Sequence, residues 1–530
     1  MSALAENHQT GLAPSARPVD SGILQLLVFV AGLVTMGAEM CASRLLAPYF
    51  GSSLPVWGLL IGLLLAYLAV GSALGGRIAD RRPEQVLVYQ LAGWAGFWIG
   101  CVPYVAHPIL RLASGGLATT ATEPLVGAFA GVLALFSLPM VLLGCVSPFV
   151  MRLSLKAIDT GGNVAGRLSA LSTLGSLLGT FGTVFALIPL LGTRRSMAVL
   201  ALVIVIVSAT GLRRACSRWA PLFIGLCLVL VVRMLLPSPP IKSSPGLLYE
   251  RDSSYNYVQV LQDGDQVVLK LNEGEGIQSV YEPDRVITGY VYDYFLLVPF
   301  FRSELWAPPL SSLCLLGLAG GTSARQFSQV FGPIPIDGVE IDPAVVEAGR
   351  RFLSLDLPNL DAITADGRAY LAHTTKQYDV VLVDAYSPPY IPFHLTTVEF
   401  FRLVHDHQTS DGVLGINVAH LQSDTALVTA VANTVASVYP SVYVVSTQGG
   451  QNSVVIASCQ PSEWTAIEAR LAHSDDTVIS DVASRAAGRI RRFIPMAGSV
   501  LTDDHAPVER MVHAMIAHYV FDPAVPEVNP

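Results

Sequence analysis

The pattern of apolar and polar residues divides the chain into two halves of different character. Before Pro237 the apolar residues form continuous runs, each near the roughly 20 residues that cross the hydrocarbon core of a bilayer. The first half is therefore expected to be a bundle of transmembrane helices. Seven runs are predicted as spans: about 22–44, 55–76, 86–106, 124–149, 168–191, 196–212 and 218–236.

The second half shows shorter periods. YNYVQVLQDGDQVVLKLNEG alternates apolar and polar residues on both sides of Asp263-Gly264, which predicts a β-hairpin. From Ser311 onward, short apolar runs alternate with helical patterns, which is typical of a doubly wound α/β sheet.

The predicted fold class is therefore multi-domain: an N-terminal α-helical transmembrane bundle, a small β element, and a Rossmann-like doubly wound α/β domain. The predicted boundaries are a polar tail at 1–21, a helical domain at 22–237, a Pro/Ser linker at 238–246, a β-hairpin domain at 247–290 and the α/β domain at 291–530.

Composition agrees with this division and excludes several classes of protein. Of the 530 residues, 52% are hydrophobic and only 14% are charged, which is far from a soluble average. The net charge of −8 and the lack of a basic stripe argue against a nucleic-acid partner. The tail has no basic region before a short apolar one, so the first span is expected to remain in the mature protein.

Cysteine and histidine spacing indicates neither a disulfide framework nor a metal site. The seven cysteines are scattered without a C-x-x-C pair, and four of them lie inside predicted spans. The histidines at 394, 405, 407 and 420 lack the spacing of ligands supported by carboxylates. No metal is therefore expected.

Two ionisable residues, Glu39 and Arg44, lie in the first predicted span. Charges inside a membrane are costly, so each needs a reason. Five residues apart, they share a helix face poorly, and an ion pair with another helix or snorkelling of Arg44 is favoured over a transport pathway. No pair of matching broken helices recurs in two halves, so the bundle is expected to anchor the protein.

Candidate chemistry gathers where predicted strands of the second half end. Gly317, Gly320 and Gly321 follow the first strand, where absent side chains let a nucleotide approach the backbone. Glu340 ends the second strand, about 20 residues on, where an acidic residue accepts hydrogen bonds from ribose hydroxyls. Asp366-Gly367 follows the third strand, and Asp384 follows the fourth. This constellation predicts a nucleoside site.

The same residues carry a resemblance to a known family. LLGLAGGTS, VEIDP, ADGRAYL and VDAYSPP are similar, in this order, to the glycine loop, ribose strand, adenine motif and catalytic loop of the spermidine synthase (polyamine aminopropyltransferase) family. SSYNYVQV, LKLNEGEGIQS and GYVYDYFLLVP resemble its preceding strands and helix, and the whole chain is similar to its membrane-fused bacterial members.

The resemblance implies a set of site residues. Asp384 would be catalytic. Cofactor contacts would come from Gly317, Gly320, Gly321, Glu340, Asp366, Gly367, Gln278 and Asn256, and substrate contacts from Tyr255, Tyr292, Asp293, Tyr386 and Ser387. Both Tyr292 and Tyr386 fit either an aromatic lining of an amine channel or ordinary packing.

Several positions depart from the family pattern. Ala319 replaces the aspartate that would hold the aminopropyl ammonium, and Asn256 replaces a glutamine. Asp293 and Tyr294 stand for His-Glu, and Ser387 stands for the second aspartate of the catalytic loop. Lost carboxylates remove charge-assisted contacts, so the acceptor amine is expected to differ from the family's usual one.

Three functions remain open. The first is a membrane-anchored aminopropyltransferase that uses decarboxylated S-adenosylmethionine as co-substrate and a diamine such as putrescine, with Asp384 accepting the amine's proton. The second is an S-adenosylmethionine-dependent methyltransferase. The third is a nucleoside-sensing domain of a polyamine-handling membrane protein. The expected partners are a polyamine and the lipid membrane, and assembly as a homodimer is left open.

Orientation is predicted in two conflicting ways. The distribution of Lys and Arg places the N-terminus inside. Seven spans would then place the α/β domain outside, where adenosine cofactors are not normally available. We expect a multi-pass protein of the cell membrane with a cytoplasmic α/β domain, against the charge distribution.

Overall fold

The structure is a computed structural model. It describes residues 21–50, 54–115, 123–155, 161–236, 241–242, 244–272, 276–302, 310–386, 391–421, 424–496, 498 and 500–521. Two compact units divide the chain. Residues 1–45, 58–109 and 129–238 make up the first, and residues 46–57, 110–128 and 239–530 make up the second.

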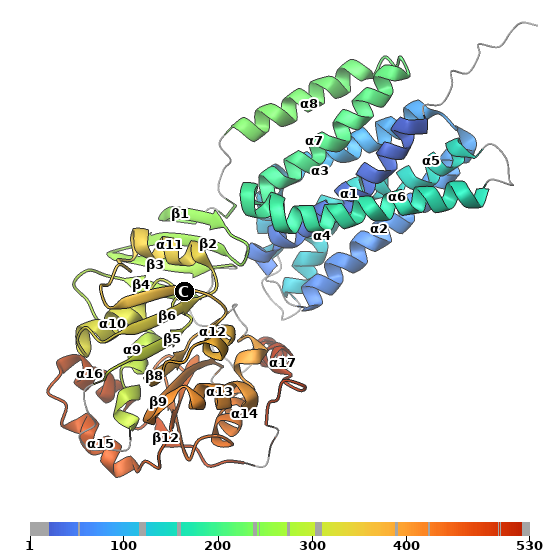
Figure 1. Ribbon diagram of the computed structural model, residues 1–530. Helices are drawn as coiled ribbons and strands as arrows, with labels where there is room; N and C mark the ends of the chain where they lie inside the picture. Colours follow the sequence, from blue (N-terminus) through green and yellow to red (C-terminus); the bar gives the residue numbers. More distant parts are fainter. Residues whose placement is uncertain are drawn as a thin grey trace, which may run out of the picture. The chain divides into compact units, whose positions relative to one another are not determined.

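The first unit is a bundle of long apolar helices (Figure 1). Its elements, apart from the helix ends within residues 46–57 and 110–128, are α1 (Ser21–Phe50), α2 (Leu54–Arg81), α3 (Gln85–Gly115), α4 (Glu123–Gly144), α5 (Val146–Ser154), α6 (Gly161–Gly182), the π-helical turn η2 (Thr183–Leu187), α7 (Ile188–Arg214) and α8 (Ala220–Leu235). Within the described ranges, five helices are long and apolar enough to cross a membrane. The predicted count of seven spans is not confirmed.

The count differs because helices are joined or shortened at two places. Four stretches begin at Ser21, Pro55, Gln85 and Val126, and the fifth, Gly161–Arg214, contains both the fifth and the sixth predicted span. The last predicted span corresponds to α8, whose 16 residues fall short of a full crossing.

The joined stretch reverses direction. Gly192 interrupts the helical dihedrals with a φ of 76°, a left-handed conformation that glycine adopts without a Cβ clash. A Cβ on Gly37 would meet Leu200 Cδ1 and Thr183 Oγ1, both at 2.8 Å. A straight helix would separate residues 183 and 200 by about 25 Å. The two parts therefore fold back on each other as a helical hairpin.

The second unit begins with a small antiparallel sheet of strands β1 (Leu247–Asp252), β2 (Tyr257–Asp263), β3 (Gln266–Leu271) and β4 (Ile277–Tyr281), in that order. Asp263 pairs with Gln266 across the turn, and Gly264 has a φ of 59°. The predicted β-hairpin at Asp263-Gly264 is thus confirmed, because Gly264 supplies the positive φ that a two-residue turn requires.

A larger sheet of eight strands follows, in the order β12-β10-β11-β9-β8-β5-β6-β7. Its strands are β5 (Leu313–Leu316), β6 (Ile336–Glu340), β7 (Leu360–Thr364), β8 (Tyr378–Val383), β9 (Gln408–Ala419), β10 (Ser441–Ser446), β11 (Asn452–Ser458) and β12 (Ile490–Arg492). Strands β5 to β9 pair in parallel, whereas β10, β11 and β12 join antiparallel. The Rossmann-like α/β fold is confirmed.

Helices cover this sheet on both faces (Figure 1). They are α9 (Val291–Phe295), the 3₁₀ turn η3 (Val298–Phe301), α10 (Thr322–Val330), α11 (Pro343–Phe352), α12 (Gly367–His373), the 3₁₀ turn η4 (Phe393–Leu395), α13 (Val398–Asp406), α14 (Ala426–Ala436), α15 (Trp464–Ala472), α16 (Thr477–Ala486) and α17 (Val508–Phe521).

The central strands are apolar throughout because both of their faces are buried. Along β5, Cys314 and Leu316 join one hydrophobic cluster, whereas Leu313 and Leu315 join another. Successive side chains of a strand point to opposite faces, so the two clusters are the two layers between sheet and helices. Because each central strand is packed on both faces, the position of its carboxyl end relative to the neighbouring strands is fixed.

The predicted domain boundaries stay a prediction. Residues 237–240 and 243 of the predicted Pro/Ser linker, and the polar tail up to residue 20, lie outside the described residues.

Candidate active site

The predicted site residues lie along one edge of the large sheet. In the order β8-β5-β6-β7, the strands end at Asp384, Gly317, Glu340 and, two residues beyond the last strand, Asp366. These strands are parallel, so their carboxyl ends share one edge. The chain leaves β5 toward β6 and later returns on its other side as β8. The boundary between β5 and β8 is therefore the topological switch point, where such sheets bind ligands.

Gly317 and Asp384 meet at this switch point. The Asp384 amide donates a hydrogen bond to the Leu316 carbonyl at 2.8 Å. Gly317 has a φ of 98°, and a Cβ there would overlap the carbonyl oxygen of Asp384. Only glycine allows this approach without strain. The glycine loop and the predicted catalytic aspartate are thus held together through their backbones.

The rest of the glycine loop is held by β4. The Gly320 amide donates to Ser279 Oγ at 2.8 Å, and Thr322 Oγ1 donates to the Val280 carbonyl at 2.9 Å. Gly321 has a φ of 87° just before α10. Gln278 lies beside Ser279 on β4 and is partly exposed. Successive side chains of a strand point to opposite faces, so Gln278 lies on the face of β4 opposite to the Ser279 hydroxyl that holds the loop.

Glu340 is buried at the end of β6 and faces the glycine loop. Its carboxylate accepts hydrogen bonds from the Ala319 amide at 2.9 Å and the Asp342 amide at 3.1 Å. Burial raises the pKa of Glu340 to about 7, and the two amides act against that rise. Ala319 itself has a φ of 47°, so its amide is turned toward Glu340 by an uncommon backbone conformation.

Asp366 caps the next helix. Its side chain accepts from the Ala369 amide at 2.8 Å, and Gly367 is the first residue of α12. His394 Nε2 lies 3.3 Å from the other carboxylate oxygen. Asp366 remains about 39% exposed, so an oxygen at the sheet edge stays open to a ligand.

Asp384 is held by a chain of amides that sequence reasoning missed. Asn417 Nδ2 donates to Asp384 Oδ1 at 2.8 Å, and Asn452 Nδ2 donates to Asn417 Oδ1 at 2.9 Å. Burial raises the pKa of Asp384 to about 6, and the Asn417 hydrogen bond counteracts that rise. The sequence did contain a signal for Asn417. It is a polar residue in GINVA, at the end of the strand predicted after Asp384, and therefore lies at the same edge of the sheet as Asp384.

Two tyrosines lie near Asp384. Tyr386 donates to the Asn417 carbonyl at 3.1 Å and accepts from the Ala419 amide at 2.6 Å, whereas Tyr292 donates to the Ile277 carbonyl at 2.5 Å. Burial, and next the charge of Asp384, raise the pKa of both phenols. Both hydroxyls are thus fixed by the protein, and both phenols remain protonated donors.

Asn256 and Asp293 make contacts of a structural kind. Asn256 is buried and donates to Asp342 Oδ2 at 3.0 Å, which ties the small sheet to the start of α11. The Asp293 carboxylate accepts from the Gly289 amide at 2.7 Å and from Gln326 Nε2 at 2.7 Å. These hydrogen bonds occupy the polar atoms that sequence reasoning had assigned to ligands.

Tyr255 and Ser387 complete the predicted set. Tyr255 lies in the turn before β2 and is 51% exposed. Ser387 lies outside the described residues.

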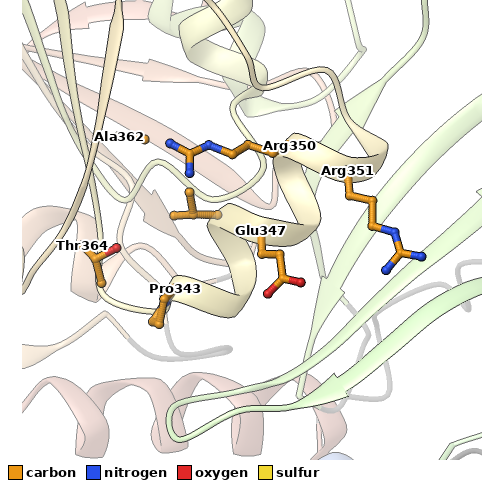
Figure 2. Close-up of a pocket in the computed structure, with 7 residues that line it drawn as sticks. Pro343, Glu347, Arg350, Arg351, Ala362 and Thr364 are labelled. Carbon is orange, nitrogen blue, oxygen red and sulfur yellow. The ribbon is translucent and has the colours of Figure 1, made fainter.

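A cavity of about 380 Å³ lies beside this edge rather than at Asp384. It is lined by α11 and by β7, with Glu347, Arg350 and Arg351 on the helix and Thr364 on the strand (Figure 2). Glu347 pairs with Arg251, and Arg350 pairs with Asp356. None of the predicted site residues that the structure describes lines it.

Comparison with known proteins identifies the domain. The sequence profile described as "Spermine/spermidine synthase domain" matches residues 321–463. A "Probable polyamine aminopropyl transferase" of Bifidobacterium longum is 33% identical over 302 residues, 53% of this chain and 66% of that protein, just under two thirds. A "Polyamine aminopropyltransferase" of Mycobacterium tuberculosis is 26% identical over 414 residues, 71% of this chain and 72% of that protein.

A solved structure gives a similar match. The crystal structure of a spermidine synthase in complex with the transition-state analogue AdoDATO is 19% identical, covers 46% of this chain and 85% of that chain, and has a TM-score of 0.38. Residues 321–463 of the C-terminal half are thus similar to the spermine/spermidine synthase domain, and the relatives named above are polyamine aminopropyltransferases by their names.

Proposed function

We propose that the chain is a polyamine aminopropyltransferase, which transfers an aminopropyl group from decarboxylated S-adenosylmethionine to a diamine such as putrescine. One observation carries the proposal: a buried carboxylate, Asp384, meets the glycine loop at the switch point of the sheet, and the acidic residue of a nucleoside site lies on the next strand but one. The names of the relatives support the same reaction class.

The chemistry follows from this arrangement. The nitrogen lone pair of the acceptor amine attacks the methylene carbon next to the sulfonium, and the carbon–sulfur bond breaks with its electron pair passing to sulfur. A neutral thioether, methylthioadenosine, leaves. The new ammonium group gives up a proton, and Asp384 is the base placed to receive it. With a pKa of about 6, its carboxylate is mostly ionised at neutral pH and basic enough for this role.

The nucleoside end would be held by the other strand ends. Glu340 would accept hydrogen bonds from ribose hydroxyls, Asp366 would accept one from the adenine amino group, and Gly317, Gly320 and Gly321 would let the nucleoside lie against the backbone. Gln278, Tyr255, Tyr292 and Tyr386 would border the aminopropyl and amine groups. Asn256 and Asp293 would support the site through the contacts described above.

One product assay tests the reaction class. The purified full-length protein is offered decarboxylated or ordinary S-adenosylmethionine, each with putrescine, cadaverine or spermidine, and products are identified by mass. We expect one aminopropyl group on the amine and release of methylthioadenosine. Methyl transfer with release of S-adenosylhomocysteine would favour a methyltransferase, and ligand binding without any product would favour a sensor.

We propose further that the apolar helices anchor the protein in the cell membrane with the second unit in the cytoplasm. Five long apolar helices support the anchoring. An impermeant maleimide, applied to intact and lysed cells, tests the orientation on a cysteine introduced at the exposed Asp361 of β7. We expect labelling only after lysis, and the exposed native Cys216 between α7 and α8 provides a second reporter.

A further inference from the structure

A histidine lies against the carboxylate to which the proposed function assigns the adenine. His394 Nε2 is 3.3 Å from Asp366 Oδ2, and the two side chains are 34% and 39% exposed. Asp366 Oδ1 accepts from the Ala369 amide at 2.8 Å, the contact that caps α12. The helix cap therefore fixes one oxygen of the carboxylate, and the second oxygen faces the imidazole. Each carboxylate oxygen can accept two hydrogen bonds, so Asp366 is still able to accept from a ligand.

The backbone of His394 is held from α12. Arg368, two residues after Asp366, donates from Nη1 to the His394 carbonyl at 3.0 Å. The same guanidinium binds both oxygens of Asp503 at 2.7 Å. Asp503 Oδ1 also accepts from the hydroxyl of Thr397, the N-cap of α13, at 2.8 Å. Three separate segments of the chain therefore fix the position of His394 relative to Asp366.

The ring of His394 is restrained as well. Phe393 packs edge-on against it, with 5.7 Å between the ring centroids and 88° between the ring planes. Both residues belong to the 3₁₀ turn η4, in which the Phe393 carbonyl accepts from the Thr396 amide at 3.0 Å and from the Thr396 hydroxyl at 2.7 Å. A side chain that is already ordered loses little further entropy when it orients a neighbour, so this histidine is suited to such a role.

The contact joins two motifs that are distant in the sequence. Asp366 belongs to ADGRAYL, whereas His394 belongs to IPFHLTT, beyond the catalytic loop that begins at Asp384. The proposed reaction uses Asp366 for the adenine amino group and Asp384 for the proton of the amine, and it gives no role to His394. The helix cap alone would leave the second oxygen of Asp366 free to turn away from the base.

We propose that His394 is a positioning residue of the nucleoside end, which holds the Asp366 carboxylate in the orientation that selects adenine. A fixed carboxylate accepts a hydrogen bond from the 6-amino group of adenine and repels a base that presents a carbonyl oxygen there. The assignment rests on the function proposed above. It adds that the choice of base depends on a residue outside the adenine motif itself.

The test compares methylthioadenosine with methylthioinosine, which carries an oxygen in place of the 6-amino group. The Kd of each nucleoside for the purified full-length protein is measured by calorimetry, with methylthioinosine displacing methylthioadenosine. His394→Phe keeps a ring that can pack against Phe393 but removes the donor nitrogen. We expect the Kd for methylthioadenosine to rise about tenfold, the effect of one lost hydrogen bond to a charged group. The Kd for methylthioinosine should change less than about twofold, since no amino group is lost from its contacts.

His394→Gln tests the role of the nitrogen. Glutamine places an amide donor at a similar reach, so most of the affinity for methylthioadenosine and of the preference for it should return. His405→Phe is the matched control. His405 is 40% exposed and lies 3.9 Å from Asp406 at the end of α13, outside the predicted site residues, so this variant should bind both nucleosides as the wild type does.

Three results would overturn the proposal, and they can be told apart. An equal loss of affinity for both nucleosides in His394→Phe would show that His394 only supports the fold of its segment. An unchanged Kd for methylthioadenosine would show that Asp366 does not depend on it. Both results would leave the proposed function standing, whereas a wild-type protein that binds neither nucleoside would overturn that function and this assignment together.

Discussion

The two ends of the candidate active site are built in different ways. At the nucleoside end, Glu340 and the glycine loop are joined by backbone amides of consecutive strand-to-helix turns, as in the hydrogen bond from Ala319. At the proposed amine end, Asp384 is held by side chains: by Asn417 of the neighbouring strand β9 and, through Asn417, by Asn452 of β11. The first end is therefore defined by local chain geometry, and the second by the register of an antiparallel pair.

This difference predicts how each end tolerates change. A backbone-built site survives many side-chain substitutions and loses affinity mainly through its one buried carboxylate. In a network of hydrogen-bonded side chains, by contrast, a substitution at one member changes how readily the central group is ionised. The following variants separate the two behaviours.

Asp384→Asn should have the largest effect. The amide keeps the shape of the side chain but cannot accept the proton of the amine, so kcat should fall by roughly 10²–10⁴-fold. Nucleoside affinity, measured by isothermal titration calorimetry, should stay near that of the wild type. Asp361→Asn, at an exposed position on β7, is the matched control. Unchanged turnover in Asp384→Asn would show that Asp384 is not the base that accepts the proton of the amine.

Glu340→Gln should act on the other end. The substitution removes a charge-assisted acceptor of ribose hydroxyls, so the Kd for methylthioadenosine should rise by roughly 10- to 100-fold. Turnover at saturating co-substrate should change far less. Calorimetry measures the Kd, and kcat measures turnover at saturation; an unchanged Kd would place the ribose elsewhere.

The pH profile of kcat/KM should sharpen the contrast. Asp384 is active as a base when ionised, so the rate should rise as the pH increases through about 6. Asn417→Leu removes the hydrogen bond that favours the ionised form, so the midpoint should move to higher pH. Asn452→Leu should give a smaller shift in the same direction, since Asn452 acts through Asn417. A midpoint that stays fixed in both variants would exclude this network from tuning Asp384.

The smallest effect is expected at the rim of the nucleoside end. Arg368 binds both oxygens of Asp503 at 2.7 Å, and this ion pair holds the pKa of Asp503 below its usual value. Its stabilisation is present above the unfolded pKa of about 3.9 and is lost as the pH falls through the lower folded value. Because both groups are partly exposed, Asp503→Asn should cost at most about 1 kcal/mol in urea unfolding at neutral pH.

The sequence alone brings the residues of the proposed nucleoside end together more readily than those of the proposed amine end, for a physical reason. Gly317, Glu340 and Asp366 each follow a buried strand, and parallel strands bring their ends to one edge whatever the details of packing. Asn452 reaches Asn417 only because β11 pairs antiparallel with β9, with Asn452 opposite Ala419. That register depends on tertiary packing, and no local pattern records it.

Two other differences between sequence and structure have equally local causes. Asn256 and Asp293 occupy motif positions, but neighbouring donors and acceptors, Asp342 and Gln326, take up their polar atoms. In the first unit, hydropathy identifies apolar length and cannot show that Gly192 folds one stretch back on itself. The fold class, which follows from the periodicity of apolar residues, was confirmed, whereas the predicted number of spans was not.

The antiparallel pairing of β9 with β11 also bears on how the domain can evolve. Asp384, Asn417 and Asn452 of the proposed amine end come from strands outside the β5-β6-β7 half that presents Glu340 and Asp366. Mutations in β11 can therefore alter the preferred acceptor while the inherited nucleoside half is left untouched. Lineages that carry this domain are expected to diversify in the amine they use and to keep the adenosine group of the donor.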